Sequence, residues 1–434
     1  MKKILAMILA LALVVALGAC TVEQPTEGQQ GGTTEITLWT YPIGGWGNEA
    51  DVNKLIEKFE AANPGIKVKV EYLDYQNGDA AVANAIQAGN TPDLIMEGPE
   101  RLVANYGAAG KMVDLSGLLD ETDKKEINAA ALAACWGADG KLYEYPLVMT
   151  AHCMAINKTI FEAAGAMEHL NAETHTWKST EDFFQAMEKV TAYMGAPAGA
   201  VYCAGQGGDQ GTRALVTNLN GGTFTNAEHT AYTWNSIENI TALTRLKDSG
   251  VVTFDASLVG GDEIREFCMG NLGVAFCWNI AQQLAPNGDK EHPEKTVNGD
   301  DILFMAFPSD ETPLLQGGIW GFGIFNNGND AKIEAAKTFI KYMCDSAATA
   351  DAVKAANYFA VRNAAEGTDL SNIWADNAIM AEYNKLMPFL GDYYQVTTGW
   401  AAARTAWWSM LQEVGTGADI TATVEKWCNT ANGK

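Results

Sequence analysis

Strand-like and helix-like segments alternate between Glu35 and Met96, and this alternation limits the possible folds more than any other feature of the chain. Glu35–Thr40 and Ile66–Tyr72 alternate apolar and polar residues, as half-buried strands do. Asp51–Asn63 carries apolar residues at helical spacing, and Ala80–Ala88 is rich in alanine. Pro92–Met96 then forms a short apolar run. This order predicts βαβ units and a mostly parallel sheet, hence an α/β fold.

A second series of the same kind begins after Pro146. His152–Asn157 is predicted to be a strand, and Ser179–Met194 a helix with a serine cap and an apolar face. Gly273–Trp278 reads as a buried strand, and the region after Ala347 is nearly all helical. The length of 434 residues is enough for two domains with a large core.

The first twenty residues read as an export signal rather than as part of the fold. Lys2 and Lys3 precede the apolar run Ile4–Val15, which is too short to span a membrane. Leu17–Cys20 resembles a bacterial lipobox, which implies cleavage after residue 19 and acylation of Cys20; an ordinary signal peptide cut nearby is the alternative. Residues 20–34 are polar and rich in Gly and Gln, so they are predicted to be a flexible tether.

The net charge limits the classes of binding partner, and the cysteine pattern indicates the redox state of the thiols. A formal net charge of −24 disfavours nucleic acid and anionic lipid, so a membrane is expected to be reached through the lipid anchor alone. Besides Cys20 there are seven scattered cysteines without a Cys-x-x-Cys motif. They are interpreted as mostly free thiols rather than as a disulfide framework.

A series of short motifs carries a family resemblance. Leu55–Glu60 precedes Asn63-Pro-Gly, and Gly89–Leu94 follows it in order. Further along lie Asp139–Pro146 and the glycine-rich Gly317–Ile324. In this order the chain resembles the family 1 extracellular solute-binding proteins, receptors of ATP-driven importers whose best-known members bind maltose and other sugars.

The resemblance implies a two-lobed periplasmic-binding-protein fold of type II-like form. Each lobe is expected to be a mostly parallel sheet flanked by helices, with crossing hinge strands at Pro146–Met149 and Gly273–Asn279. The implied ranges are 1–19 for the signal peptide, 20–34 for the lipidated cysteine and tether, 35–145 and 280–342 for the first lobe, and 146–279 and 343–434 for the second. Ligand binding between the lobes would drive hinge closure.

Two pairs of residues match sugar-contacting motifs of the maltose-binding type. Trp400 and Arg404 are four residues apart, which places both on one helix face, and the resemblance implies ring stacking by Trp400 and hydroxyl recognition by Arg404. Glu100 and Arg101 stand where those receptors carry an acid–arginine pair that holds sugar hydroxyls. The alternatives are a core tryptophan with a surface arginine, and an ordinary helix N-terminus.

Six further residues are weaker candidates for the walls of the cleft, each weighed against a simple core or turn position. Trp278 and Asn279 end a predicted crossing strand, although their alignment with the family is uncertain by one or two positions. Trp46 follows the first strand, and Trp320 lies in a glycine-rich segment. The remaining two are Tyr41 and Asp209.

No motif for a metal, a cofactor or a catalytic centre appears in the sequence. There is no His-x-x-x-His, Cys/His cluster, phosphate loop or Gly-x-Ser-x-Gly elbow. Together with this absence, the family resemblance implies a monomeric lipoprotein, not an enzyme, that captures a mono- or oligosaccharide and delivers it to the permease of an ABC transporter. Two alternatives stay open: a receptor for a polyamine, peptide or phosphate ester, and an extracellular polysaccharide hydrolase that uses two carboxylates.

Overall fold

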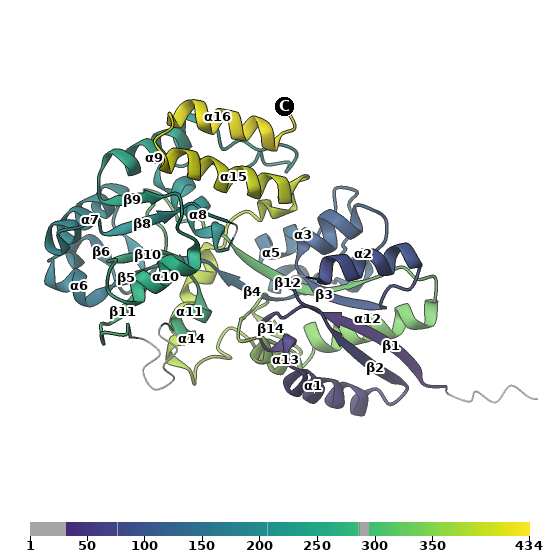
Figure 1. The fold of residues 1–434 in the computed structure, drawn as a ribbon. Coiled ribbons are helices and arrows are strands. Elements are labelled where there is room, and N and C mark those ends of the chain that lie inside the picture. Colours follow the sequence, from purple (N-terminus) through teal and green to yellow (C-terminus); the bar gives the residue numbers. More distant parts are fainter. Residues whose placement is uncertain (1–31, 76, 206, 285, 287–294) are drawn as a thin grey trace, which may run out of the picture.

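The computed structural model describes residues 32–75, 77–205, 207–284, 286 and 295–434 (Figure 1). The predicted signal peptide and Cys20 lie outside the described residues, as does the predicted tether up to residue 31. Among the helices of the described part, none combines the length and the apolar character that crossing a bilayer requires.

Six strands form the sheet of the first lobe, in the order β13-β4-β12-β3-β1-β2. β1 lies parallel to β2 and β3, whereas β12 runs antiparallel to both β3 and β4. These strands are β1 (Thr34–Thr40), β2 (Ile66–Tyr72), β3 (Leu94–Glu97), β4 (Tyr145–Ala151), β12 (Gly317–Ile324) and β13 (Phe359–Ala360).

Amphipathic helices cover the first sheet because each turns one apolar face toward it. In α1 the buried residues are Val52, Leu55, Ile56 and Phe59, the ones whose spacing predicts a helix, and Asn48 caps its N-terminus. The helices of this lobe are α1 (Glu49–Ala62), α2 (Gly78–Ala88), α3 (Pro99–Arg101), α4 (Asp123–Glu126), α5 (Ala129–Ala134), α12 (Asp330–Cys344) and α13 (Thr349–Ala356).

The second lobe is built around a three-stranded antiparallel sheet, β10-β5-β11, and a parallel pair, β8-β9. Its strands are β5 (Cys153–Asn157), β8 (Gly199–Tyr202), β9 (Val252–Asp255), β10 (Val274–Trp278) and β11 (Ile302–Met305). Its helices are α6 (Lys158–Ala163), α7 (Thr180–Met194), α8 (Asp209–Leu219), α9 (Ile237–Asp248), α10 (Gly260–Cys268), α11 (Ile280–Leu284), α14 (Ala378–Tyr383), α15 (Trp400–Gly415) and α16 (Ile420–Ala431).

Short elements complete the fold. The 3-10 helix η1 (Gly44–Gly47) follows β1, and η5 (Asn384–Phe389) continues directly from α14. Two small hairpins, β6 (Leu170–Asn171) with β7 (Thr176–Trp177) and β14 (Ala364–Ala365) with β15 (Thr368–Asp369), lie outside the main sheets. The remaining single-turn helices are η2 (Leu102–Gly107), η3 (Ser116–Leu118), η4 (Met167–His169) and η6 (Tyr394–Val396).

The two-lobed α/β architecture agrees with the prediction, but the sheets are mixed rather than mostly parallel. β4 and β12 connect the lobes and enter the first sheet as a pair that runs in opposite directions (Figure 1). The β5 sheet is antiparallel throughout. The alternation of strands and helices along the sequence does not show this, because strand direction depends on where the chain crosses between the lobes.

The predicted lobe boundaries need three corrections. β4 is a strand of the first sheet, although the sequence predicts residues 146–279 to belong to the second lobe. β11 pairs with β5 and therefore lies in the second lobe, although 280–342 was assigned to the first. β13 pairs with β4, and α13 packs on α1, so the chain after residue 342 first completes the first lobe.

The predicted hinge at Gly273–Asn279 is also wrong. This segment forms β10, which pairs with β5 inside the second lobe. The chain instead passes between the lobes at His152, between β11 and β12, and between β15 and α14.

Asp93 stabilises the first lobe through contacts with three elements. It is buried, and its carboxylate accepts hydrogen bonds from the Thr37 backbone N–H at 2.8 Å and from Asn327 Nδ2 at 2.6 Å. Lys332 Nζ on α12 approaches it to 3.0 Å. Asp93 therefore joins β1, β3 and the start of α12.

We predict that Asp93→Ala lowers the free energy of unfolding by about 3–5 kcal/mol, because it leaves buried donors and a lysine without their acceptor. Urea denaturation followed by circular dichroism measures this loss. The control Asp51→Ala removes an exposed contact with Lys54 and is expected to cost less than about 1 kcal/mol. Equal losses in the two variants would contradict the role given to Asp93.

Candidate functional site

The first wall of the site follows directly from β3. The buried strand ends at Glu97, and Gly98 and Pro99 start the short helix α3 that carries Glu100 and Arg101. Because α3 begins at the end of a sheet strand, both side chains reach the edge of the lobe that faces the second lobe.

Arg101 is held in place by two carboxylates and two rings. Its Nε donates to Asp79 Oδ1 and its Nη1 to Glu97 Oε1, both at 2.7 Å. The guanidinium carbon lies 5.1 Å from the ring centre of Tyr41 and 5.7 Å from that of Tyr75. The planar group is therefore oriented in advance, since bidentate contacts and stacking both restrict it.

Several acidic groups crowd this wall. Burial and the neighbouring Glu100 carboxylate raise the pKa of Glu97 to about 8, against the opposing effect of Arg101. Glu100 accepts a hydrogen bond from the Tyr393 hydroxyl at 2.7 Å. Glu144 is fully buried behind them, and burial, followed by the charges of Glu100 and Glu97, raises its pKa well above the usual range. Burial and mutual repulsion thus favour the uncharged forms of Glu97 and Glu144, whereas Arg101 favours the carboxylate of Glu97.

The second wall lies at the start of α15. Trp400 is the first residue of the helix, and Arg404 follows one turn later with its guanidinium 5.8 Å from the Trp400 ring centre. Arg404 donates to both oxygens of Asp209 on α8, at 3.0 and 2.9 Å. Asp209 is buried and also forms an ion pair with Arg213.

Arg213 packs against the Trp400 ring. It is fully buried, and its guanidinium carbon lies 4.8 Å from the Trp400 ring centre. Its Nε donates to the Tyr394 hydroxyl at 2.9 Å, and Phe224 stacks on Tyr394 with ring centres 4.6 Å apart. A buried cation among aromatic rings fixes the position of Trp400.

The two walls face each other across one cavity of about 620 Å³. Glu100 and Arg101 line it from the first lobe, and Trp400 and Arg404 from the second. The structure thus brings together both residue pairs that the sequence singled out, although they are separated by about three hundred residues. The remaining lining residues are Asp79, Ala104, Asn105, Thr397, Thr398, Gly399, Ala401 and Ala402.

Two predicted tryptophans belong to the core instead. Trp278 is fully buried, and its indole N–H donates to Gln283 Oε1 at 2.9 Å. Trp46 is also fully buried and donates to the Ala352 carbonyl at 3.1 Å. The prediction that they line the cleft was wrong, because helices packed on β10 and β1 enclose both rings.

Four other candidates have indirect or different positions. Asn279 accepts a hydrogen bond from the Ala281 backbone N–H at the start of α11, and Trp320 stacks on Tyr358 at 4.9 Å between ring centres. Tyr41 and Asp209 are buried and orient Arg101 and Arg404 from behind the cavity wall.

Several residues of the site carry no sequence signal that sets them apart. Asp79 lies within an alanine-rich helix, and Thr397 and Thr398 precede α15 without a recognisable motif. Arg213 sits on α8 four residues after Asp209, which is a helical ion-pair spacing and the one clue that the sequence offers.

His152 lies where the chain passes from β4 to β5, within electrostatic range of the second wall. Burial, reinforced by the charges of Arg213 and Arg404 and opposed by Asp209, lowers the pKa of His152 to about 4. The imidazole is therefore neutral at physiological pH and adds no positive charge near Arg213 and Arg404.

The part of the chain that the structure describes contains no group of three metal-ligating side chains. What the cavity offers is hydrogen-bonding capacity and an aromatic surface. Carboxylates accept, guanidinium groups donate, and an indole ring provides an apolar face.

Comparison with known families assigns the chain. Residues 54–382 match the family model described as bacterial extracellular solute-binding protein. The chain belongs to this family. A two-lobed fold with a cavity between the lobes is consistent with a solute-binding protein.

Individual relatives of this solute-binding protein are distant. The arabinooligosaccharide-binding protein of Bacillus subtilis (strain 168) is 24% identical over 248 residues, which are 56% of this chain and 53% of that protein. The match therefore spans about half the length of the curated relative.

Solved structures share the fold over almost the whole chain. The cyclic alpha-maltosyl-1,6-maltose binding protein from Arthrobacter globiformis aligns with a TM-score of 0.75 and 19% identity, covering 93% of this chain and 99% of that one. An ABC substrate-binding protein from Listeria monocytogenes in complex with cycloalternan aligns with a TM-score of 0.68 and 19% identity, covering 92% and 98%.

The depressed pKa of His152 predicts a specific pH dependence of stability. Between pH 6.5 and 4 the unfolded chain binds a proton that the folded protein does not, so folding is weakened as the pH falls through this window. Between pH 7 and pH 5, we expect the free energy of unfolding of the wild type to fall by up to about 2 kcal/mol more than that of the His152→Gln variant. Urea denaturation at both pH values measures this, and parallel losses would contradict it.

Proposed function

We propose that this solute-binding protein captures an uncharged carbohydrate between its lobes and delivers it to the permease of an ABC transporter. The observation that carries the proposal is the cavity shared by Glu100 and Arg101 from one lobe and Trp400 and Arg404 from the other. A ligand that contacts both walls favours the conformation in which they approach, so binding and closure are linked.

The chemistry of the cavity suits a sugar ring. Trp400 is half-buried and supported by Arg213, so its indole is a rigid platform for the apolar face of a pyranose or furanose. Arg101, Arg404 and Glu100 provide planar donors and an acceptor for hydroxyl groups. The cavity volume of about 620 Å³ lies within the range of about 300–1,000 Å³ that is typical of small-molecule sites.

The charge of the lining supports a neutral ligand over the alternatives. Asp79 and Glu100 contribute two negative charges, and Arg101 and Arg404 two positive ones. A polyamine receptor needs an excess of acids in its cleft, and a receptor for phosphate esters an excess of bases. Neither excess is present among the lining residues, which favours carbohydrate.

The geometry also favours binding over catalysis. A glycoside hydrolase needs one carboxyl group as an acid and another as a base or nucleophile. Asp79 is hydrogen-bonded to Arg101 and Tyr41, and these contacts outweigh burial and hold the pKa of its carboxyl below the usual range. Glu100 accepts from Tyr393. Each of the two carboxylates that line the cavity is thus already hydrogen-bonded to other side chains of the protein.

The names of the relatives point the same way, since the curated relative and the aligned structures are binding proteins for oligosaccharides. Export follows from the signal-like N-terminus, and anchoring through an acylated Cys20 would keep the receptor beside its permease. We infer a monomer that faces the outside of the cell.

We predict that Trp400→Ala weakens oligosaccharide binding by tenfold or more, since loss of a stacking surface costs about 1.4 kcal/mol or more. Titration calorimetry with maltose, maltotriose, arabinotriose and cellotriose measures this. The matched control is Trp427→Ala, which removes a half-buried tryptophan of the same lobe that does not line the cavity. The oligosaccharide affinity of this control variant should stay within twofold of that of the wild type.

Small-angle scattering adds a second test. The sugar that binds wild type should reduce the radius of gyration, because closure brings the lobes together. Binding of spermidine or of glucose 6-phosphate with no response to any of the four sugars would overturn the carbohydrate proposal. Release of shorter sugars from cellotriose or maltotriose by the purified protein would establish an enzyme instead.

A further inference from the structure

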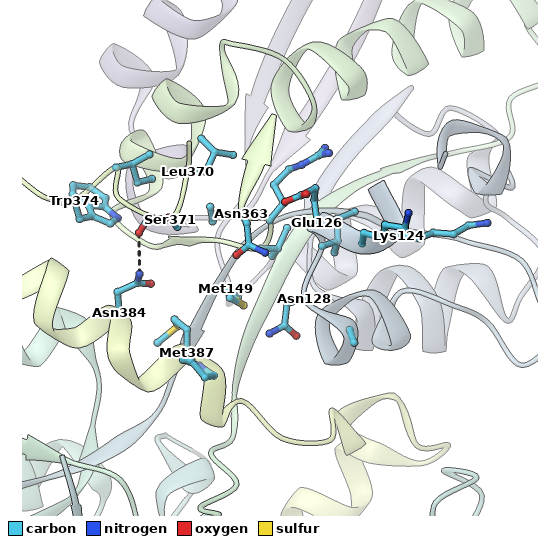
Figure 2. Close-up of a pocket in the computed structure, with 18 residues that line it drawn as sticks. Lys124, Glu126, Asn128, Met149, Asn363, Leu370, Ser371, Trp374, Asn384 and Met387 are labelled. Atoms are coloured by element: carbon cyan, nitrogen blue, oxygen red, sulfur yellow. Dashed lines mark hydrogen bonds between the residues drawn. The ribbon is translucent and has the colours of Figure 1, made fainter. Parts of the chain in front are cut away.

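A second cavity, of about 440 Å³, lies beside the hinge and shares no lining residue with the inter-lobe cavity (Figure 2). Its floor is apolar and includes the buried side chains of Met149, Val361 and Met387. Polar side chains, among them Asn363 and Asn384, stand at its edge. Polar groups make up the larger share of the lining, and the buried apolar side chains cover only its floor.

The two cavities lie on opposite faces of the hinge strand β4. Successive side chains of a strand point to opposite faces, so Met149 and Thr150 face opposite ways. In Figure 1, α3 and α15, which carry the walls of the inter-lobe cavity, lie on one side of β4, and α14, which leads into η5 of the second cavity, lies on the other side. The cavity over Met149 is therefore behind the hinge, and we call it the rear cavity.

Both lobes contribute to the rear cavity. Asn363 belongs to the first lobe, where its backbone N–H donates to the Glu126 carbonyl at 3.1 Å. Asn384 and Met387 lie on η5, directly after α14. α14 is tied to the second lobe by Glu382, whose carboxylate lies 2.9 Å from His175 Nε2, and by Tyr383, whose ring packs 4.8 Å from Phe304. A molecule in the rear cavity would touch both lobes.

The lining fits an uncharged, hydroxylated ring. In Figure 2, Trp374 lies at one end of the cavity, next to Ser371 and Asn384, and Asn384 Nδ2 donates to the Ser371 carbonyl at 3.3 Å. The amides of Asn128 and Asn363 provide groups that both donate and accept. Indole surface and amides together recognise the apolar face and the hydroxyls of a sugar.

Three cationic side chains and one anionic side chain line the rear cavity, and acidic partners outside the lining balance the excess. Arg362 is neutralised by Asp123 and Asp345, at 2.8 and 2.6 Å. Lys124 pairs with Glu121, at 2.8 Å. The other two ionic residues of the lining, Lys125 and Glu126, carry opposite charges. A strongly charged ligand would therefore find no net attraction.

We propose that the rear cavity is a second binding site, for an uncharged mono- or disaccharide, and that its occupancy is coupled to closure of the main cleft. Rotation about the hinge that brings the cleft walls together moves the rear walls apart, because the two cavities lie on opposite faces of β4. A ligand that spans the rear walls therefore prefers one separation of the lobes. By linkage, rear and cleft ligands change each other's affinity by the same factor.

The site is tested with D-glucose, L-arabinose and maltose as probes, by saturation-transfer NMR and titration calorimetry. Trp400→Ala impairs the main cleft and isolates the rear cavity. In this background Asn363→Trp places an indole over the rear cavity, and Asn372→Trp makes the same change at an exposed residue that does not line it. Circular dichroism and thermal melting establish that each variant is folded.

We expect at least one probe to bind the Trp400→Ala protein. The affinity for that probe should stay within twofold when Asn372→Trp is added and should fall tenfold or more when Asn363→Trp is added. The site is overturned if no probe binds the Trp400→Ala protein. Binding that Asn363→Trp leaves unchanged overturns it equally, because the probe then sits elsewhere.

Coupling is tested in wild type, and this part rests on the proposed function. The affinity of the oligosaccharide that binds the main cleft is measured with and without a saturating concentration of the rear probe. We expect a change of about fivefold or more, and an unchanged affinity would overturn the coupling. A wild type that binds no oligosaccharide contradicts the proposed function, whereas the Trp400→Ala titration reports on the rear site alone.

Discussion

The pairing of β4 with β12 is the contact on which the rest of the structure depends. These two strands are paired from Gly317 opposite Ala151 to Phe322 opposite Tyr145, and they connect one lobe to the other. Their backbones approach so closely that a Cβ atom on Gly321 would lie 2.1 Å from the Tyr145 carbonyl oxygen. Glycine is needed there because of this close approach.

Ion pairs organise both walls of the main cavity. Asp209 holds Arg404 and Arg213, and Arg213 supports the Trp400 ring. The buried ion pair thus positions a ring that lines the cavity. On the other wall, the exposed Asp79 and the buried Glu97 hold Arg101. Buried ion pairs such as those of Asp209 are costly to break, because each break leaves an unpaired buried charge. They hold the groups at the cavity surface in a definite orientation before a ligand arrives.

The accuracy of the sequence-based predictions depended on whether a local pattern determined the feature. The apolar spacing in α1 and the serine cap of α7 led to correct helices, because both are properties of neighbouring residues. The tryptophans were harder to assign. Trp46 and Trp400 both follow a glycine at or near the start of a helix, yet one ring is in the core and the other lines the cavity. Which ring is enclosed depends on distant elements, such as α13 over Trp46.

The amino-acid sequence by itself determined the α/β class, several of the helices and the identity of two residue pairs, Glu100–Arg101 and Trp400–Arg404, that line the cavity. It did so because hydrophobic periodicity, capping and short motifs are encoded within a few residues of one another. Only the tertiary structure decided the strand directions, the lobe to which β11 and β13 belong, and the enclosure of Trp278. These features depend on contacts between segments that are far apart in the chain. The segments meet only because the chain crosses between the lobes, and no local sequence pattern encodes such contacts.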